Sequence, residues 1–226
     1  MEKLSKILLL SALVFFLMVV NSQANLIDLT LAYPEIYSDG TGTYQYNADT
    51  DLFSSTAQAI KIIFADVSHV YITGGQDSDP AFGDYKVQFK VDSSGNFAGG
   101  VAGNDLEIWG DIDKDKDGNI DYSGLLIAGE ITNFGWQDLG PYYSMFNFTF
   151  DFVDGALSSY YADSENTGGN IMISENSDFN SNWSVSHSGN KVKNETAPVP
   201  EPGTLLLLSM GLISLVGFKK KMSIKL

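Results

Sequence analysis

The chain has 226 residues, a formal net charge of −15 and no cysteine, which excludes disulfides, thiolate metal sites and a cysteine nucleophile. All thirteen basic residues are lysine, and this acidic balance argues against nucleic-acid binding, which needs a basic face to neutralise phosphates. Aromatic residues make up 12 % of the chain, which is typical of a folded protein rather than a disordered one.

The first 24 residues have the pattern of an export signal. Lys3 and Lys6 precede a run of 14 residues, 7–20, that is apolar except for Ser11. As a helix this run would span roughly 21 Å, which is short for a bilayer core of about 30 Å but suits a signal peptide. Small residues occupy the −3 and −1 positions of a cleavage site after Ala24. We therefore predict a signal peptide over residues 1–24 and export through the Sec machinery.

Residues 25–190 are predicted to form one β-rich domain. In the segment 145–152 four phenylalanines alternate with polar residues, as in an antiparallel strand with one buried and one wet face. Short helices are expected only at 54–59 and 157–161. Frequent Asp-Gly and Gly-Gly turn signals favour an all-β fold, an antiparallel β-sandwich or jelly-roll-like domain. Further strands are predicted at 26–33, 41–47, 59–65, 70–73, 84–91, 105–110, 125–134 and 171–174.

An acidic loop between two predicted strands is the sharpest chemical motif of this domain. Asp113, Asp115 and Asp117 match positions 1, 3 and 5 of an EF-hand calcium loop, and Gly118 matches the sharp turn at position 6. Calcium prefers six to eight oxygen ligands, and this spacing wraps carboxylates around one point. The predicted ligand set is Asp113, Asp115, Asp117, Asn119 and Asp121.

The loop departs from an EF-hand at its end and in its surroundings. Gly124 stands where the bidentate glutamate of position 12 is expected, and no periodic helices flank the loop. We therefore expect calcium affinity in the weak range of extracellular modules, with a dissociation constant of about 10⁻⁴–10⁻³ M. The alternative is a solvated acidic turn, in which Lys114 and Lys116 neutralise part of the charge.

The C-terminal end combines a linker, an apolar run and charged or proline-rich borders. The polar segment 191–199 is predicted to be a linker, and 204–218 an apolar helix that enters the membrane. Positive residues after such a helix stay on the cytoplasmic side. The bordering residues are Pro200, Glu201 and Pro202 before the run, and Lys219, Lys220 and Lys221 after it.

The segment 200–222 resembles the PEP-CTERM sorting signal of exported bacterial proteins, which is also labelled an ice-binding protein C-terminal domain. The resemblance implies processing by an exosortase-type membrane enzyme and transient anchoring in the inner membrane through the apolar helix. Delivery to the cell surface or the extracellular space would follow. The charge distribution agrees with this topology. The body between the two apolar runs has seven lysines and 26 acidic residues, a net charge of −19, which suits the outer side of the membrane.

Catalytic motifs are missing from the sequence. It has two histidines and no nucleophile elbow, P-loop or dinucleotide fingerprint. We predict a non-enzymatic surface or extracellular-matrix protein, associated with the exopolysaccharide of a biofilm, in which calcium stiffens one loop. Two alternatives stay open: a calcium-dependent carbohydrate- or ice-binding module, and a polysaccharide hydrolase that uses Asp and Glu.

Overall fold

The computed structural model describes residues 26–27, 29, 31–76, 80–139, 144–162, 166–173, 178–186 and 190–195. The predicted signal peptide, its cleavage site at Ala24 and the sorting motif lie outside these residues, as does the predicted apolar helix 204–218. Among the residues described, no helix has the length and apolar character needed to cross a membrane.

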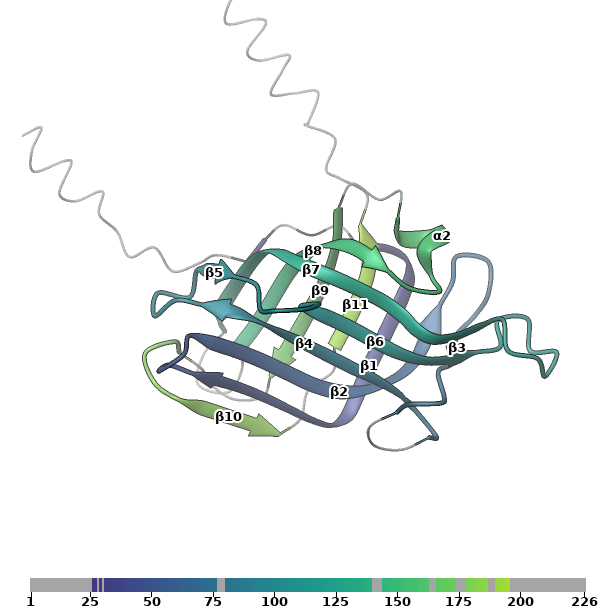
Figure 1. The fold of residues 1–226 in the computed structure, drawn as a ribbon, viewed down its shortest axis with the longest axis horizontal. Coiled ribbons are helices and arrows are strands. Elements are labelled where there is room, and N and C mark those ends of the chain that lie inside the picture. Colours follow the sequence, from purple (N-terminus) through teal and green to yellow (C-terminus); the bar gives the residue numbers. More distant parts are fainter. Residues whose placement is uncertain are drawn as a thin grey trace, which may run out of the picture.

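The described part of the chain is built from antiparallel strands and one short helix (Figure 1). The prediction of an all-β, antiparallel fold is therefore confirmed. The elements in chain order are β1 (Leu31–Asn47), β2 (Leu52–Ile63), β3 (Val70–Tyr71), β4 (Gly83–Val91), β5 (Phe97–Gly99), β6 (Leu106–Ile112), β7 (Tyr122–Asp138), β8 (Ser144–Asp154), α2 (Ser158–Tyr161), β9 (Asn166–Ile173), β10 (Trp183–Ser186) and β11 (Asn190–Glu195).

The strands form one sheet that closes on itself. Starting from β1, the neighbours are β11, β9, β8, β7, β6, β4 and β2, and β2 pairs again with β1. The long strands β1 and β7 contain register shifts, and such bulges bend a strand so that it can turn between two halves of a sheet. Figure 1 shows β2, β4, β6 and β7 crossing in front of β8, β9 and β11. The two halves therefore face each other as in a sandwich.

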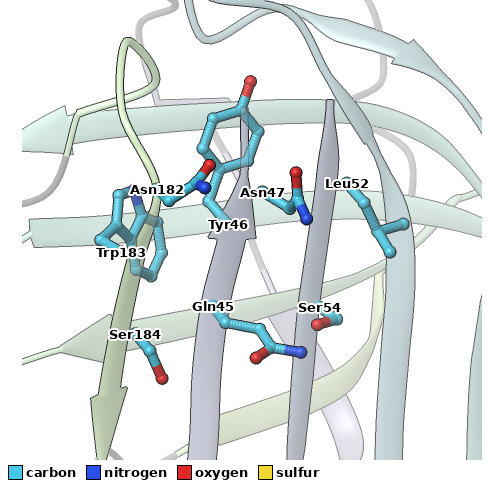
Figure 2. Close-up of a pocket in the computed structure, with 8 residues that line it drawn as sticks. All are labelled: Gln45, Tyr46, Asn47, Leu52, Ser54, Asn182, Trp183 and Ser184. Carbon is cyan, nitrogen blue, oxygen red and sulfur yellow. The ribbon is translucent and has the colours of Figure 1, made fainter. Parts of the chain in front are cut away.

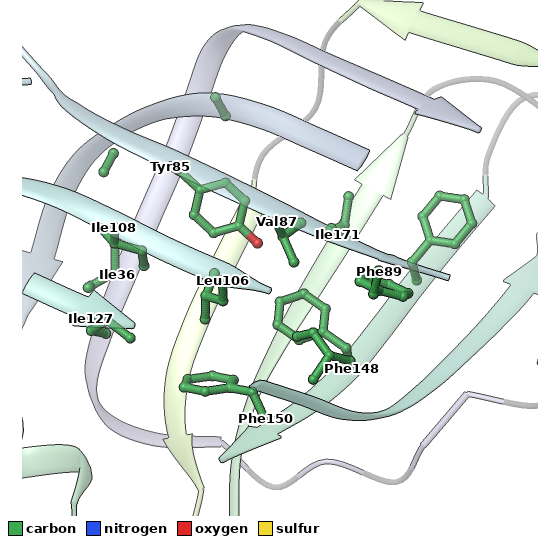
Figure 3. Close-up of a cluster of buried hydrophobic side chains, with 14 of the residues drawn as sticks. Ile36, Tyr85, Val87, Phe89, Leu106, Ile108, Ile127, Phe148, Phe150 and Ile171 are labelled. Carbon is green, nitrogen blue, oxygen red and sulfur yellow. The ribbon is translucent and has the colours of Figure 1, made fainter. Parts of the chain in front are cut away.

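Aromatic side chains from opposite halves fill the interior (Figure 3). The ring of Phe53 on β2 lies 5.4 Å from that of Phe146 on β8, and Phe89 on β4 lies 6.3 Å from Phe148 on β8. Since β8 neighbours neither β2 nor β4 in the sheet, these contacts cross the core. Phe146, Phe148 and Phe150 are at most 1 % exposed, so the phenylalanine face predicted for this strand is confirmed over these three residues.

The other face of β8 is more covered than the alternation predicts. Asp151 is exposed and Thr149 is half-buried, but Asn147 is buried. The carboxamide of Asn147 accepts a hydrogen bond from the N–H of Ile27 at 2.9 Å and donates one to the carbonyl of Ile27 at 2.5 Å. The segment around Ile27, before β1, therefore covers this part of the sheet. A local alternation pattern carries no information about such a long-range contact.

One of the two predicted helices is wrong. Helix α2 lies within the predicted range 157–161, but residues 54–59 belong to β2. There Ser55 pairs with Tyr44 of β1 on one side and with Val87 of β4 on the other. Backbone pairing on both sides overrides the weak local preference of this short Ser-, Thr- and Ala-rich segment.

The sheet also extends past the domain boundary predicted at residue 190, so the linker does not begin at Lys191. Asn190–Glu195 form β11, and Val192 pairs with Ile36 of β1 and with Gly169 of β9. Valine is the single apolar residue among these six, so the sequence carries no alternation to mark the strand. The remainder of the predicted linker, 196–199, lies outside the described residues.

Candidate metal centre

The acidic loop connects β6 and β7, as the sequence predicts, and projects from one end of the closed sheet (Figure 1). At its base Ile112 pairs with Tyr122, and the N–H of Asp121 donates to the carbonyl of Ile112 at 2.8 Å. The loop therefore begins and ends at a fixed point of the sheet. Between these ends the chain is free to fold around its own carboxylates.

Three predicted ligands come together in this loop. One carboxylate oxygen each from Asp113, Asp115 and Asp117 can be chosen so that all lie within 4.8 Å of one another. Asp113 accepts hydrogen bonds from the N–H of Gly118 at 2.8 Å and of Asp117 at 3.2 Å. Gly118 has a φ of +93°, the left-handed conformation that the sharp turn at position 6 requires.

The other two predicted ligands, Asn119 and Asp121, make hydrogen bonds within the same loop. Asn119 donates to the carboxylate of Asp117 from its backbone N–H at 2.8 Å and from its carboxamide at 3.0 Å. Asp121 accepts a hydrogen bond from the N–H of Lys114 at 2.7 Å. The assignment of all five residues as calcium ligands stays a prediction.

Neighbouring carboxylates contribute to a raised pKa at Asp115. A hydrogen bond from the N–H of Asp117 lowers the pKa of Asp115, but partial desolvation and the negative charges of Asp117, Asp121 and Asp113 outweigh it, so that this pKa is raised. The backbone and side-chain hydrogen bonds from Asn119 lower the pKa of Asp117. A cation bound between the carboxylates would relieve the repulsion that Asp115 experiences.

Lys114 points away from the carboxylates. Its Nζ lies 2.9 Å from Oδ2 of Asp66 and 3.2 Å from the hydroxyl of Tyr160, and 4.9 Å from the centre of the Phe64 ring. The hydrogen bond with Asp66, followed by that with Tyr160, raises the pKa of Lys114. Lys114 therefore ties the loop to the chain after β2 and to α2 instead of neutralising the acidic cluster. No local sequence signal links these residues, which lie 46 and 48 positions apart.

A carboxyl pair in the sheet bears on the hydrolase alternative. Asp105 is buried and accepts hydrogen bonds from the N–H of Val101 at 2.7 Å and of Ile131 at 3.0 Å. Half-buried Glu130 lies beside it. Because both oxygens of Asp105 accept hydrogen bonds from the backbone, this carboxylate joins segments of the fold and gives no support to a catalytic role.

Replacing Glu130 with glutamine should remove a pH dependence of stability. Burial raises the pKa of Glu130, and the charge and hydrogen bond of Asp105 add to this effect. Native Glu130 thus keeps its proton above pH 4.5, where the unfolded chain loses it, so stability is full below this pH and falls as pH rises through the raised pKa. We expect Glu130→Gln to melt at a higher temperature than wild type at pH 7, and the difference to shrink at pH 4. Parallel melting curves across this range would contradict the expectation.

A groove of about 440 Å³ lies on the outer face of β1, β2 and β10, and no sequence pattern predicts it (Figure 2). Its residues come from positions 45–54 and 182–184, and only pairing between β1 and β10 brings them together.

The comparisons with known proteins concern the C-terminal end. Residues 198–221 match the family model of the PEP-CTERM protein-sorting motif. No curated protein and no solved structure matches the chain. The predicted sorting motif is therefore confirmed: the chain carries a PEP-CTERM protein-sorting motif, which supports export, processing by an exosortase and sorting to the cell surface.

Proposed function

We propose that this is a non-enzymatic surface or extracellular-matrix protein whose β-domain associates with extracellular polysaccharide of a biofilm. The observation that carries the proposal is the sorting motif at 198–221. The body between the apolar runs has a net charge of −19, while six lysines flank those runs. This distribution supports a topology with the basic ends inside the cell and the domain outside.

Processing of the tail should depend on its borders. In a host with an exosortase, we expect Pro202→Ala, or replacement of Lys219, Lys220 and Lys221 by glutamine, to leave most of the chain unprocessed in the membrane fraction. Lys225→Gln lies beyond the matched residues and serves as the control. Immunoblots of membrane and surface fractions measure the ratio. Normal release of the motif variants would contradict this role of the tail.

The acidic loop is proposed to hold one structural calcium ion. Its support is the convergence of Asp113, Asp115 and Asp117 and the raised pKa of Asp115, together with the engagement of Lys114 elsewhere. Calcium would add positive charge between these carboxylates. With its far end fixed in this way, the β6–β7 loop would become a stiff projection of the domain outside the cell.

A further inference from the structure

The groove introduced above lies where β10 and β2 flank β1. Register places Gln45 between Ser184 of β10 and Ser54 of β2, all three in one row across the strands. Gln45 and Asn47 are exposed, whereas Tyr46 between them is buried, so the row belongs to the outer face of the sheet. Figure 2 shows Asn47, Asn182 and Trp183 gathered at one end of the groove.

The lining is neutral and rich in hydrogen-bonding groups. Carboxamides or hydroxyls come from Gln45, Asn47, Ser54, Asn182 and Ser184, and none of the residues that line the groove is charged. This is notable in a body with a net charge of −19. An ionic ligand would find no counter-charge here, whereas a neutral ligand with many hydroxyl groups would find donors and acceptors.

Two of the carboxamides are held in place before any ligand arrives. Oδ1 of Asn47 accepts hydrogen bonds from the N–H of Asp49 at 2.9 Å and of Thr50 at 3.2 Å. Oδ1 of Asn182 accepts one from the N–H of Ala48 at 2.6 Å. With both oxygens fixed by the β1–β2 turn, the two NH₂ groups are left as donors for a ligand, and little side-chain entropy is lost on binding.

Trp183 anchors β10 from the other face of the sheet, because it pairs with buried Tyr46 and packs against the core. Its Nε1 donates to the carbonyl of Asp178 at 2.5 Å, and its ring stacks on Phe146 at a centroid distance of 6.0 Å and an angle of 12°. The groove itself therefore offers a ligand mainly the hydrogen-bonding side chains of the outer face.

We propose that this groove binds a neutral saccharide unit. Hydroxyl groups of the sugar accept hydrogen bonds from the carboxamides of Asn47 and Asn182. The volume of about 440 Å³ falls in the usual range of small-molecule sites, about 300–1,000 Å³. The inference rests on the proposed association with extracellular polysaccharide and gives that association a site and a ligand class.

Binding of the purified full-length chain to an array of neutral hexose and uronic-acid oligosaccharides tests the proposal, with titration calorimetry on the best neutral glycan. We expect a neutral glycan to bind, and Asn182→Ala or Gln45→Ala to weaken binding about tenfold, the worth of one or two lost hydrogen bonds. Gln45→Ala should leave the fold intact, because in the described structure the Gln45 side chain is exposed and has no hydrogen-bond partner. A loss of binding in this variant therefore reports on the groove and not on misfolding. Asn180→Ala, an exposed asparagine outside the groove, is the matched control and should bind as wild type does.

A chelator separates this site from the acidic loop. The groove lies at the Leu52–Lys90 end of the sheet, whereas the loop follows Ile112 at the Gly83 end, so binding should persist without calcium. Three results would overturn the proposed saccharide site. They are loss of binding with the chelator, binding of uronic acids alone, and equal binding by Asn182→Ala and wild type. Absence of any glycan binding would overturn it too, while leaving surface sorting, which is measured in cells, unaffected.

Discussion

Replacing Phe146 with alanine should lower the free energy of unfolding by about 3–5 kcal/mol, the usual cost of removing a buried phenylalanine. Phe146 is fully buried, and its ring stacks on Phe134 and Trp183 at 5.9 Å and 6.0 Å. It also contacts Phe53 across the interior, so the alanine leaves a cavity lined from several strands. Urea unfolding followed by circular dichroism gives the difference.

Val153 supplies the control on the same strand. Its side chain is 52 % exposed, so Val153→Ala should change the free energy of unfolding by no more than about 0.5 kcal/mol. If Phe146→Ala were as mild as Val153→Ala, the closed sheet would not be held by the aromatic core described above.

Calcium should raise the stability of the wild-type chain. For a dissociation constant of about 10⁻⁴–10⁻³ M, 10 mM calcium would add roughly 1.4–2.7 kcal/mol, because an ion that binds only the folded state stabilises it by RT ln(1 + [Ca²⁺]/Kd). At about 2–4 °C per kcal/mol for a domain of this size, the melting temperature should rise by roughly 3–11 °C.

Asp115→Asn should abolish most of this rise. Without calcium the variant should be at least as stable as wild type, because the neutral amide relieves the repulsion from Asp117, Asp121 and Asp113 that raises the pKa of Asp115. Asp49→Asn, an exposed change on the β1–β2 turn, should keep the full response. If calcium raised the melting temperature of Asp115→Asn as much as that of wild type, calcium binding at this loop would be contradicted.

The strands with a strong period-two pattern could be predicted from the sequence. The phenylalanines of β8 are the clearest case, and three of the four fill the core as expected. Strands β10 and β11 were not predicted. Strand β11 is short and has one apolar residue, and it is held in the sheet by backbone pairing with β1 and β9. Closure of the sheet depends on the same long-range pairing of β1, which local patterns do not contain.

The acidic loop was predictable because its residues are consecutive. Spacing alone placed Asp113, Asp115 and Asp117 in one turn and required a left-handed Gly118, and the structure shows both features. The direction of Lys114 was not predictable, since Asp66 lies on a different part of the chain. The groove was missed for the same reason: its walls are set by pairing between strands that are more than a hundred residues apart in sequence.

Exosortase-dependent delivery is tested most directly by following the full-length chain in two otherwise identical hosts, one with an exosortase and one without. The motif at 198–221 predicts a shortened chain at the cell surface or in the medium of the first host. In the second host, the chain should keep its tail and stay in the membrane fraction. Equal surface delivery of the chain in both hosts, with the same mass, would contradict the sorting function.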